Sequence, residues 1–299
     1  MKYRVENVTI LGLGTLGAQI ALQSLASGYR VRAYDPDENA LNRFMETSIY
    51  SNRFTLKSNR VDLSKWKEAA DNMEILSSLR EAVQGADLII EVVPENLDLK
   101  LGVWREIDQY TPRKAIIATN SSSIQVSKLE GATSRPEQCL NIHFYQLILG
   151  QNMADIMGGT QTSAETLEAG KEYVRSLGVV PLSVRKEILG FCFNRVWRAV
   201  KKEVLKMWAG GYVDYHDLDR GWMIFTGTPW GPFGLMDSVG LDVVYDIEMV
   251  YYQNSKNPED LPPAALEDMI RVGKLGVKTS EGFYRYPNPE YLDPHFLRP

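Results

Sequence analysis

Residues 7–17 read N-V-T-I-L-G-L-G-T-L-G, in which a short apolar run leads directly into a glycine-rich turn of the form G-x-G-x-x-G. The run predicts a buried β-strand over residues 7–11, because most of its residues are β-branched or aliphatic. After the turn, apolar residues at helical spacing predict an amphipathic helix that ends at Gly28. A second strand is predicted over residues 30–34 and ends at Asp35. Strand, turn, helix and strand in this order favour an α/β fold.

Each glycine of the turn has a defined role when such a unit binds a dinucleotide. The first permits the tight turn, the second lets the main chain approach a pyrophosphate, and the third lets helix and strand pack closely. The pyrophosphate then lies at the helix N-terminus, where free N–H groups and the helix dipole favour negative charge. We therefore predict a Rossmann-type dinucleotide-binding domain, in which the turn residues that bind the cofactor are Gly12, Leu13, Gly14, Thr15, Leu16 and Gly17.

Asp35 completes this pattern. It lies eighteen residues after Gly17, near the position from which an acid bonds the adenosine ribose hydroxyls. A carboxylate there repels a 2′-phosphate. Arg32 lies two positions earlier along the strand and does not replace the acid. The predicted cofactor is therefore NAD rather than NADP.

The composition sets broad limits on the class of protein. The chain has 299 residues, 44% of them hydrophobic, with a net charge of -5, which is enough for one large domain or two. Neither a nucleic acid nor an anionic membrane surface is expected as a partner of a mildly acidic chain. No apolar run approaches the roughly 18 residues of a spanning helix, and the N-terminus lacks a secretory pattern. Cys139 and Cys192 lie in apolar elements without metal-type spacing, so we predict no metal site, buried thiols and a cytoplasmic location.

Two further buried strands are predicted to place polar residues at the same edge of the sheet. The strand over residues 86–93 stops at Pro94 and is followed by Glu95, while the strand over 114–118 leads into Asn120-Ser121-Ser122-Ser123. Carboxyl ends of parallel strands form the ligand-binding edge of an open α/β sheet. The alternative role for the serines is to cap the next helix, predicted over residues 124–129, and serines can do both.

Residues 37–67 are predicted to be helical, with Leu41, Phe44, Met45 and Ile49 on one face. The basic residues of this segment could meet the phosphates of a nucleotide-tailed substrate. The interpretation that we prefer is an ordinary solvated face, because acidic residues are interleaved with them.

His143 is one of three histidines, with His216 and His295, and only His143 follows an apolar, strand-like run in the middle of the chain. Imidazole exchanges a proton near neutral pH, although an isolated histidine is more often a satisfied core residue. The composition changes at residues 185–190, and the chain is predominantly helical from there. We therefore predict an NAD-binding domain over residues 1–185 and an all-α C-terminal domain over 190–299.

Three features of the helical part bear on function. Asn194 lies near the start of a helix predicted over residues 191–209, where its amide is either a buried helix-end partner or a substrate contact. Residues 228–234 (T-P-W-G-P-F-G) predict a rigid, aromatic loop. Further helices are predicted over residues 241–252 and 264–272.

Eight segments of the chain resemble the 3-hydroxyacyl-CoA dehydrogenases, in the order of that family and at nearly its spacing. The related lambda-crystallin/gulonate and carnitine dehydrogenases share most of the pattern. The segments are the Gly12 loop, residues 86–97, Asn120–Ser123, His143-Phe144, Gly190-Phe191 with Asn194-Arg195, Gly231–Phe233, Val239–Asp242 and Glu281–Tyr284.

The resemblance implies an NAD-dependent enzyme that converts an L-3-hydroxy group to a 3-oxo group in a cleft between two domains. It implies that His143 is the catalytic base and that Asp155 stands where the family has a glutamate. Ser122 and Asn194 match the residues around the substrate oxygen. A homodimer formed through the helical domain is also implied. The further positions implied to contact NAD are Glu95, Lys100, Ser122 and Lys278.

The chain departs from the family pattern mainly around the substrate. Asp155 is one methylene shorter than glutamate, Gln146-Leu147 replaces an Asn-Pro pair, and residues 150–153 replace a Met-Lys-Leu-type stretch. The basic hairpin that meets CoA phosphates is shortened between residues 50 and 71. Two substrate classes therefore stay open, an acyl-CoA and a free hydroxy acid. A non-catalytic NAD-binding protein is the third interpretation.

Overall fold

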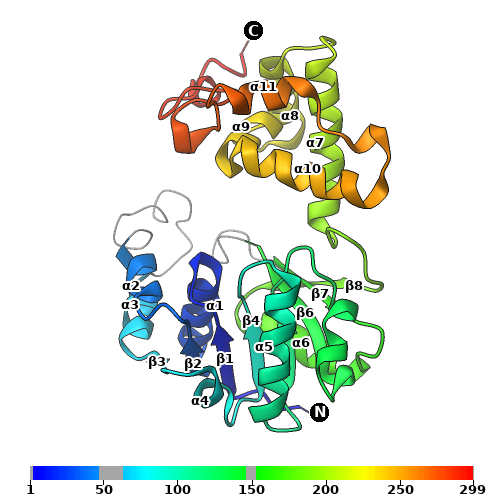
Figure 1. Ribbon diagram of the computed structural model, residues 1–299. Coiled ribbons are helices and arrows are strands. Elements are labelled where there is room, and N and C mark those ends of the chain that lie inside the picture. The colour runs from blue at the N-terminus through cyan, green and yellow to red at the C-terminus, as the bar shows by residue number, and fades with distance from the viewer. Residues whose placement is uncertain (1–2, 47–62, 146–152, 299) are drawn as a thin grey trace. The chain divides into compact units, whose positions relative to one another are not determined.

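The computed structural model describes residues 3–46, 63–145 and 153–298, and the chain divides into two compact units, Met1–Phe193 and Asn194–Pro299. Figure 1 shows the two units. Among the basic residues of the segment 37–67, which could meet the phosphates of a nucleotide-tailed substrate, Arg53, Lys57 and Arg60 lie outside the described residues. The Gln146-Leu147 pair also lies outside them.

Unit 1 is built on an eight-stranded sheet with the order β3-β2-β1-β4-β5-β6-β7-β8. The strands from β1 to β6 are parallel; β7 pairs antiparallel with β6, and β8 is parallel to β7. The order 3-2-1-4-5-6 within it is that of a Rossmann fold. The strands are β1 Asn7–Leu11, β2 Arg30–Tyr34, β3 Glu74–Ile75, β4 Leu88–Glu91, β5 Ile116–Thr119, β6 Cys139–Phe144, β7 Met153–Gly158 and β8 Val180–Val184.

Helices cover both faces of this sheet (Figure 1). Successive strand residues point to opposite faces, so Ile90 belongs to one core and Ile89 to the other. The first core includes residues of α1 (Thr15–Ala26), α2 (Ala40–Phe44), α3 (Leu63–Asp71) and α6 (Ala164–Ser176). The second includes residues of α4 (Leu79–Val83) and α5 (Leu97–Tyr110). Because both faces are covered, the central strands are continuous runs of buried residues.

Several helices begin at side chains that cap them. Asn96 accepts a hydrogen bond from the Leu99 N–H at 2.9 Å, and Ser163 accepts one from the Thr166 N–H at 3.1 Å. Such caps satisfy main-chain donors that the first helical turn leaves free. They fix where α5 and α6 begin.

Unit 2 is helical. It contains α7 (Phe193–Ala209), which begins at the unit boundary, α8 (Tyr215–Thr226), α9 (Pro232–Val239), α10 (Leu241–Ser255) and α11 (Ala264–Arg271). Its core is rich in aromatic rings; the rings of Phe233 and Phe283 lie 4.6 Å apart. Two buried aspartates connect segments of unit 2. Asp219 of α8 accepts hydrogen bonds from the Phe233 and Gly234 N–H groups of α9. Asp237 of α9 accepts hydrogen bonds from the Phe283 and Tyr284 N–H groups.

The predicted fold class, a Rossmann-type domain followed by an all-α domain, is confirmed. Three local predictions are wrong. Residues 124–129 form no α-helix but lead into 3-10 turns, Val126–Lys128 and Glu130–Ala132. The predicted loop 228–234 ends early, because Pro232 starts α9 and proline suits the first turn of a helix. Cys139 is buried as predicted, whereas Cys192 is exposed because it lies in the turn before α7.

Candidate active site

The glycine turn after β1 has the geometry that a dinucleotide requires. Gly12 has a φ of 101°, and a Cβ on it would lie 2.7 Å from the Val92 carbonyl oxygen. A Cβ on Gly17 would lie 1.9 Å from the Gly12 carbonyl oxygen, so helix and turn pack too closely for any side chain there. A Cβ on Gly14 would meet nothing within 4 Å, which leaves the space that a phosphate group needs.

The start of α1 is open to an anion. Its N-cap residue is Gly14, which has no side chain to bond the first N–H groups of the helix. These N–H groups and the helix dipole favour negative charge. The residues of the turn therefore fit the diphosphate of a dinucleotide.

Asp35 lies directly after β2 and is held beside this turn. Its Oδ2 accepts a hydrogen bond from the Leu13 N–H at 2.7 Å, and its Oδ1 accepts one from the Asp37 N–H at 2.9 Å. A carboxylate oxygen can accept more than one hydrogen bond, so both oxygens keep capacity for ribose hydroxyls. The geometry is compatible with the predicted role of Asp35.

Glu95 organises the serine-rich turn that follows β5. Its Oε1 accepts hydrogen bonds from the Ser121 hydroxyl at 2.5 Å, the Ser123 hydroxyl at 2.7 Å and the Ser123 N–H at 2.9 Å. Burial raises the pKa of this carboxyl, but these hydrogen bonds and the nearby Lys100 outweigh burial and hold the pKa below its usual value. The ionised Glu95 side chain thus holds the serine turn in place through these hydrogen bonds. Ser122, between the two bonded serines, is exposed, and its hydroxyl has no partner among the described residues.

Lys100, predicted to contact the cofactor, has its ammonium group inside unit 1. The side chain is 1% exposed, and its Nζ donates to Glu91 Oε1 at 2.6 Å and to the Val93 carbonyl oxygen at 3.0 Å. Glu91 is the last residue of β4 and is fully buried, and it also accepts a hydrogen bond from the Thr119 hydroxyl. Lys100 therefore anchors α5 to the sheet at the edge where Glu95 lies. No sequence pattern predicts that Glu91 is its buried partner.

Two asparagines join the serine turn to β6. Asn120 Oδ1 accepts a hydrogen bond from the Phe144 N–H at 2.9 Å, and Asn141 Nδ2 donates to the Ser121 carbonyl oxygen at 3.0 Å. Both side chains are buried. The serine turn and the end of β6 are consequently held as one structure, with His143 at that end.

His143 and Asp155 form a cross-strand pair on neighbouring strands β6 and β7. Residues opposite one another in an antiparallel pair point to the same face of a sheet. His143 is 4% exposed and Asp155 is fully buried. The distance from His143 Nδ1 to Asp155 Oδ2 is 3.5 Å, which is too long for a good hydrogen bond. His143 Nδ1 and Asp155 Oδ1 are both buried without a hydrogen-bond partner among the described residues.

Two aromatic rings pack against His143 and a third packs against one of them; none of the three is among the site residues predicted from the sequence. The Tyr145 hydroxyl donates to Asp155 Oδ2 at 2.6 Å, and its ring lies 4.7 Å from the His143 ring in an edge-to-face arrangement. The Phe191 ring lies 5.2 Å from that of His143, and the Phe193 ring lies 5.8 Å from that of Tyr145. Strand alternation was the available signal for Tyr145, because residues 143 and 145 share a side of an extended chain.

The remaining predicted site residues, Asn194 and Lys278, belong to unit 2. Asn194 lies in the first turn of α7 and is partly exposed. The Lys278 Nζ donates to both carboxylate oxygens of Asp242 at 2.5 Å, and both side chains are partly exposed. Their predicted contacts with substrate and cofactor remain predictions.

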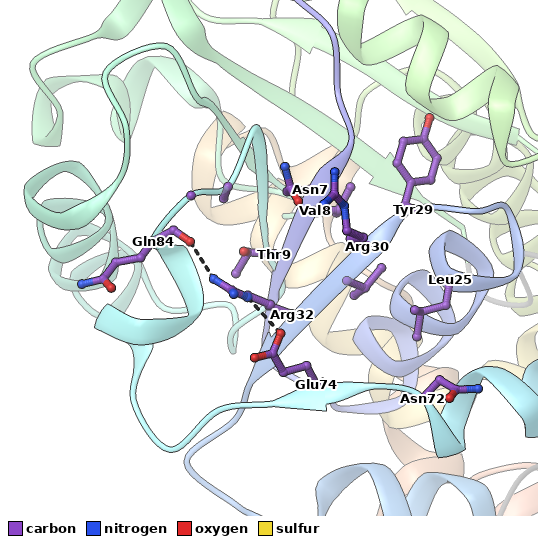
Figure 2. Close-up of a pocket in the computed structure, with 13 residues that line it drawn as sticks. Asn7, Val8, Thr9, Leu25, Tyr29, Arg30, Arg32, Asn72, Glu74 and Gln84 are labelled. Carbon is purple, nitrogen blue, oxygen red and sulfur yellow. Dashed lines mark hydrogen bonds and ion pairs between the residues drawn. The ribbon is translucent and has the colours of Figure 1, made fainter.

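A cavity of about 430 Å³ lies away from these residues, at the amino-terminal ends of β1 and β2 (Figure 2). Arg32 lines it and donates to Glu74 and to the Gln84 carbonyl oxygen. Open α/β sheets bind their ligands at the opposite, carboxyl ends of the strands. The cavity is therefore separate from the candidate active site.

Among the described residues, no helix is both long enough and apolar enough to cross a membrane.

The turn, the acid after β2 and the histidine at the end of β6 define the class of NAD-binding oxidoreductases. Comparison with known families agrees: residues 7–188 match the 3-hydroxyacyl-CoA dehydrogenase NAD-binding domain, and residues 190–286 match the C-terminal domain of the same family. The chain belongs to the 3-hydroxyacyl-CoA dehydrogenase family, whose members are NAD-dependent enzymes that act on CH–OH groups.

Relatives with different substrates in their names are similar to this chain. A 5-formyl-3-hydroxy-2-methylpyridine 4-carboxylate 5-dehydrogenase of Mesorhizobium japonicum is 30% identical, over 94% of this chain and 91% of the relative. The mitochondrial hydroxyacyl-coenzyme A dehydrogenase of Sus scrofa is 29% identical, over 95% and 92%. The family is thus shared, while the names differ in whether the substrate carries CoA.

Similar solved structures likewise include one whose name contains a CoA substrate and one whose name does not. A diketoreductase, described as catalysing reactions of dicarbonyl compounds, has a TM-score of 0.82 and 34% identity, with 94% of this chain and 99% of that chain covered. The (S)-3-hydroxybutyryl-CoA dehydrogenase of Ralstonia eutropha has a TM-score of 0.84 and 28% identity, with 95% and 100% covered. The fold therefore extends over nearly the whole of each protein.

Proposed function

We propose that the protein interconverts an L-3-hydroxy group and a 3-oxo group, with His143 as the acid–base residue and an L-3-hydroxyacyl-CoA as the substrate. The observation that carries the proposal is the buried pair of His143 and Asp155 at the carboxyl end of β6, on the sheet whose β1 ends in the glycine turn. Parallel strands place these two features at one edge. Oxidation of an alcohol needs both a base and a hydride acceptor.

The proposed chemistry divides between cofactor and protein. NAD, held by the glycine turn and Asp35, would supply hydride transfer to or from the carbon that carries the reacting oxygen. His143 takes the hydroxyl proton, and in reverse its imidazolium returns a proton to the developing alkoxide. Because Nδ1 faces Asp155, the nitrogen left for the substrate is Nε2. The Asp155 carboxylate favours the tautomer with the proton on Nδ1 and stabilises the imidazolium that forms.

Other residues of the chain would bind and orient the reactants. The turn from Gly12 to Gly17 binds the diphosphate, and Asp35 bonds the ribose hydroxyls. The exposed Ser122 hydroxyl and the Asn194 amide hold the substrate oxygen in line with His143. Lys278 and Glu95 are proposed as further cofactor contacts. Lys100 acts with them by fixing the end of β4 through Glu91.

A second substrate class, a hydroxy or oxo compound without CoA, is favoured by particular observations. Asp155 stands where the family has the longer glutamate, and its Oδ2 lies 3.5 Å from His143 Nδ1, which supports a substrate side that differs from that of the family. The diketoreductase and the pyridine-carboxylate dehydrogenase are similar proteins whose names contain no CoA thioester.

The test is the rate of NADH oxidation, followed by absorbance, with acetoacetyl-CoA and with acetoacetate under the same conditions. We expect turnover with acetoacetyl-CoA at a kcat/KM at least tenfold above that with acetoacetate. A preference for acetoacetate would assign the protein to the second substrate class. Tight NADH binding without turnover of either substrate would refute the proposed function and favour the non-catalytic interpretation.

A homodimer formed through unit 2 and a cytoplasmic location are also proposed. Unit 2 exposes large apolar side chains such as Phe225 and Ile224, which would suit a subunit contact. Sedimentation of the purified protein at micromolar concentration tests the dimer, and a monomer would exclude it.

A further inference from the structure

We propose that Tyr145 is a positioning residue of the active site, whose hydroxyl holds the Asp155 carboxylate in place against His143. The inference rests on the proposed function, because it needs His143 as the acid–base residue. It adds a third member, Tyr145, to the predicted pair and explains how an aspartate serves at this position.

The contacts of Asp155 Oδ2 carry the proposal. This oxygen accepts the Tyr145 hydroxyl at 2.6 Å, while His143 Nδ1 lies 3.5 Å away from the same atom. The other oxygen, Oδ1, is buried and has no hydrogen-bond partner in the described part of the chain. The tyrosine hydroxyl is thus the one donor within good hydrogen-bond distance of the carboxylate among the described residues.

Burial makes that donor necessary. Asp155 is fully buried, and a carboxylate removed from water is strongly destabilised unless donors and opposite charge compensate it. The Tyr145 hydroxyl supplies a charge-assisted hydrogen bond while His143 is neutral. When His143 takes a proton, the carboxylate is already in position to stabilise the cation. Tyr145 therefore acts on the reaction through Asp155 and needs no contact with the substrate.

The backbone and the ring packing keep this arrangement in place. His143 and Asp155 are opposite one another across β6 and β7, and Tyr145 follows two residues after His143. The imidazole is enclosed by the rings of Tyr145 and Phe191, at centroid distances of 4.7 and 5.2 Å. The Tyr145 ring packs edge-to-face against the imidazole, an arrangement that aromatic pairs prefer. The phenol hydroxyl is consequently directed at the carboxylate before any substrate binds.

The length of the acidic side chain explains why a hydroxyl is needed. One added methylene extends a side chain by about 1.5 Å. A glutamate at position 155 would reach far enough to close the 3.5 Å gap to His143 and form a direct hydrogen bond. An aspartate falls short of Nδ1, so its carboxylate requires a second donor. Tyr145 and Asp155 are therefore expected to depend on each other.

The first experiment compares Tyr145→Phe with Tyr173→Phe in steady-state kinetics with acetoacetyl-CoA and NADH. Tyr173 is a matched control, because its buried hydroxyl makes a 2.6 Å hydrogen bond with Ser24, outside the proposed site. We expect Tyr145→Phe to lower kcat about tenfold, with KM and the NADH dissociation constant changed less than twofold. Tyr173→Phe should leave kcat unchanged. A kcat for Tyr145→Phe within twofold of the wild type would overturn the proposal.

The second experiment is rescue by Asp155→Glu in the Tyr145→Phe background. We expect the double variant to recover at least half of the lost kcat, because the longer carboxylate reaches His143 without the phenol. A double variant no more active than Tyr145→Phe would contradict the dependence of the two residues. Failure of the proposed function itself is distinguishable, since the wild-type protein would then turn over neither acetoacetyl-CoA nor acetoacetate.

Discussion

Replacement of Lys100 by methionine tests how the cofactor edge of the sheet is held together. The Lys100 ammonium lies 2.6 Å from Glu91 Oε1, in a pair whose side chains are 1% and 0% exposed. Methionine keeps an unbranched chain of similar length but removes the charge and the donors. Glu91 would then remain buried without a counter-charge.

The magnitude follows from what Glu91 retains. Removal of one member of a buried ion pair costs roughly 3–5 kcal/mol, because the remaining charge is uncompensated. Glu91 keeps the Thr119 hydroxyl at 2.9 Å, the Val93 N–H at 2.9 Å and a long contact to the Trp104 indole at 3.4 Å. We therefore expect the lower limit, about 3 kcal/mol. With an m-value of about 2–3 kcal/mol/M, the urea midpoint should fall by about 1–1.5 M.

Urea unfolding followed by circular dichroism provides the assay, with Lys114→Met as the matched control. Lys114 is 81% exposed and lies 3.9 Å from Asp87, so its loss should cost less than about 1 kcal/mol. The double variant Glu91→Gln/Lys100→Met should recover part of the loss, since no buried charge is left. Equal small effects of Lys100→Met and Lys114→Met would refute the reasoning. An NADH titration of the double variant separately tests whether Lys100 contacts the cofactor.

Three further predictions concern individual side chains. His143→Gln should lower kcat by roughly 10²-fold or more while sparing NADH affinity, and unchanged turnover would exclude the histidine as the base. Asp35→Ala should weaken the preference for NADH over NADPH in kcat/KM, whereas a wild-type preference for NADPH would contradict the role of the acid. Glu95 has a pKa below its ordinary value of 4.5, because hydrogen bonds from Ser121 and Ser123 outweigh burial. The ionised Glu95 carboxylate therefore contributes its full stabilisation of the folded protein above pH 4.5. This stabilisation is lost as the pH falls through the lowered pKa. The difference in Tm between wild type and Glu95→Gln should shrink on acidification, and a constant difference would contradict this assignment.

The geometry of the glycine turn and of Asp35 beside it could be predicted because local chemistry determines it. Gly12 needs a positive φ, Gly17 has no room for a Cβ, and Asp35 lies at the end of the adjacent strand. Each requirement is met within about thirty residues of sequence, and the order of strand, turn and helix makes it recognisable. Glu95 and the serine turn follow buried strands in the same way.

The catalytic half depends on pairing that no local pattern encodes. His143 faces Asp155 only because β7 runs antiparallel to β6 in one particular register. A shift by one residue would turn every side chain of β7 to the other face. Glu91 lies within an apolar run, and its pairing with Lys100 depends on how α5 packs against the sheet. These contacts follow from tertiary packing, so the pairing of Glu91 could not be predicted. For Tyr145, strand alternation indicates only that it lies on the same side of the chain as His143.

The cofactor half and the catalytic half of the proposed site are therefore expected to respond differently to side-chain substitutions. In the proposed function, main-chain N–H groups of the turn bind the diphosphate, and most side-chain substitutions leave these groups in place. The proposed proton transfer relies on side chains of two antiparallel strands, on which Asp155 Oδ2 lies 3.5 Å from His143 Nδ1. A hydroxyl at position 145 can make up for the shorter acid only if both residues are present. Tyr145 and Asp155 should therefore be substituted together rather than singly. Asp155→Glu alone, with Tyr145 retained, should gain little activity, because the phenol already occupies the space beside Oδ2.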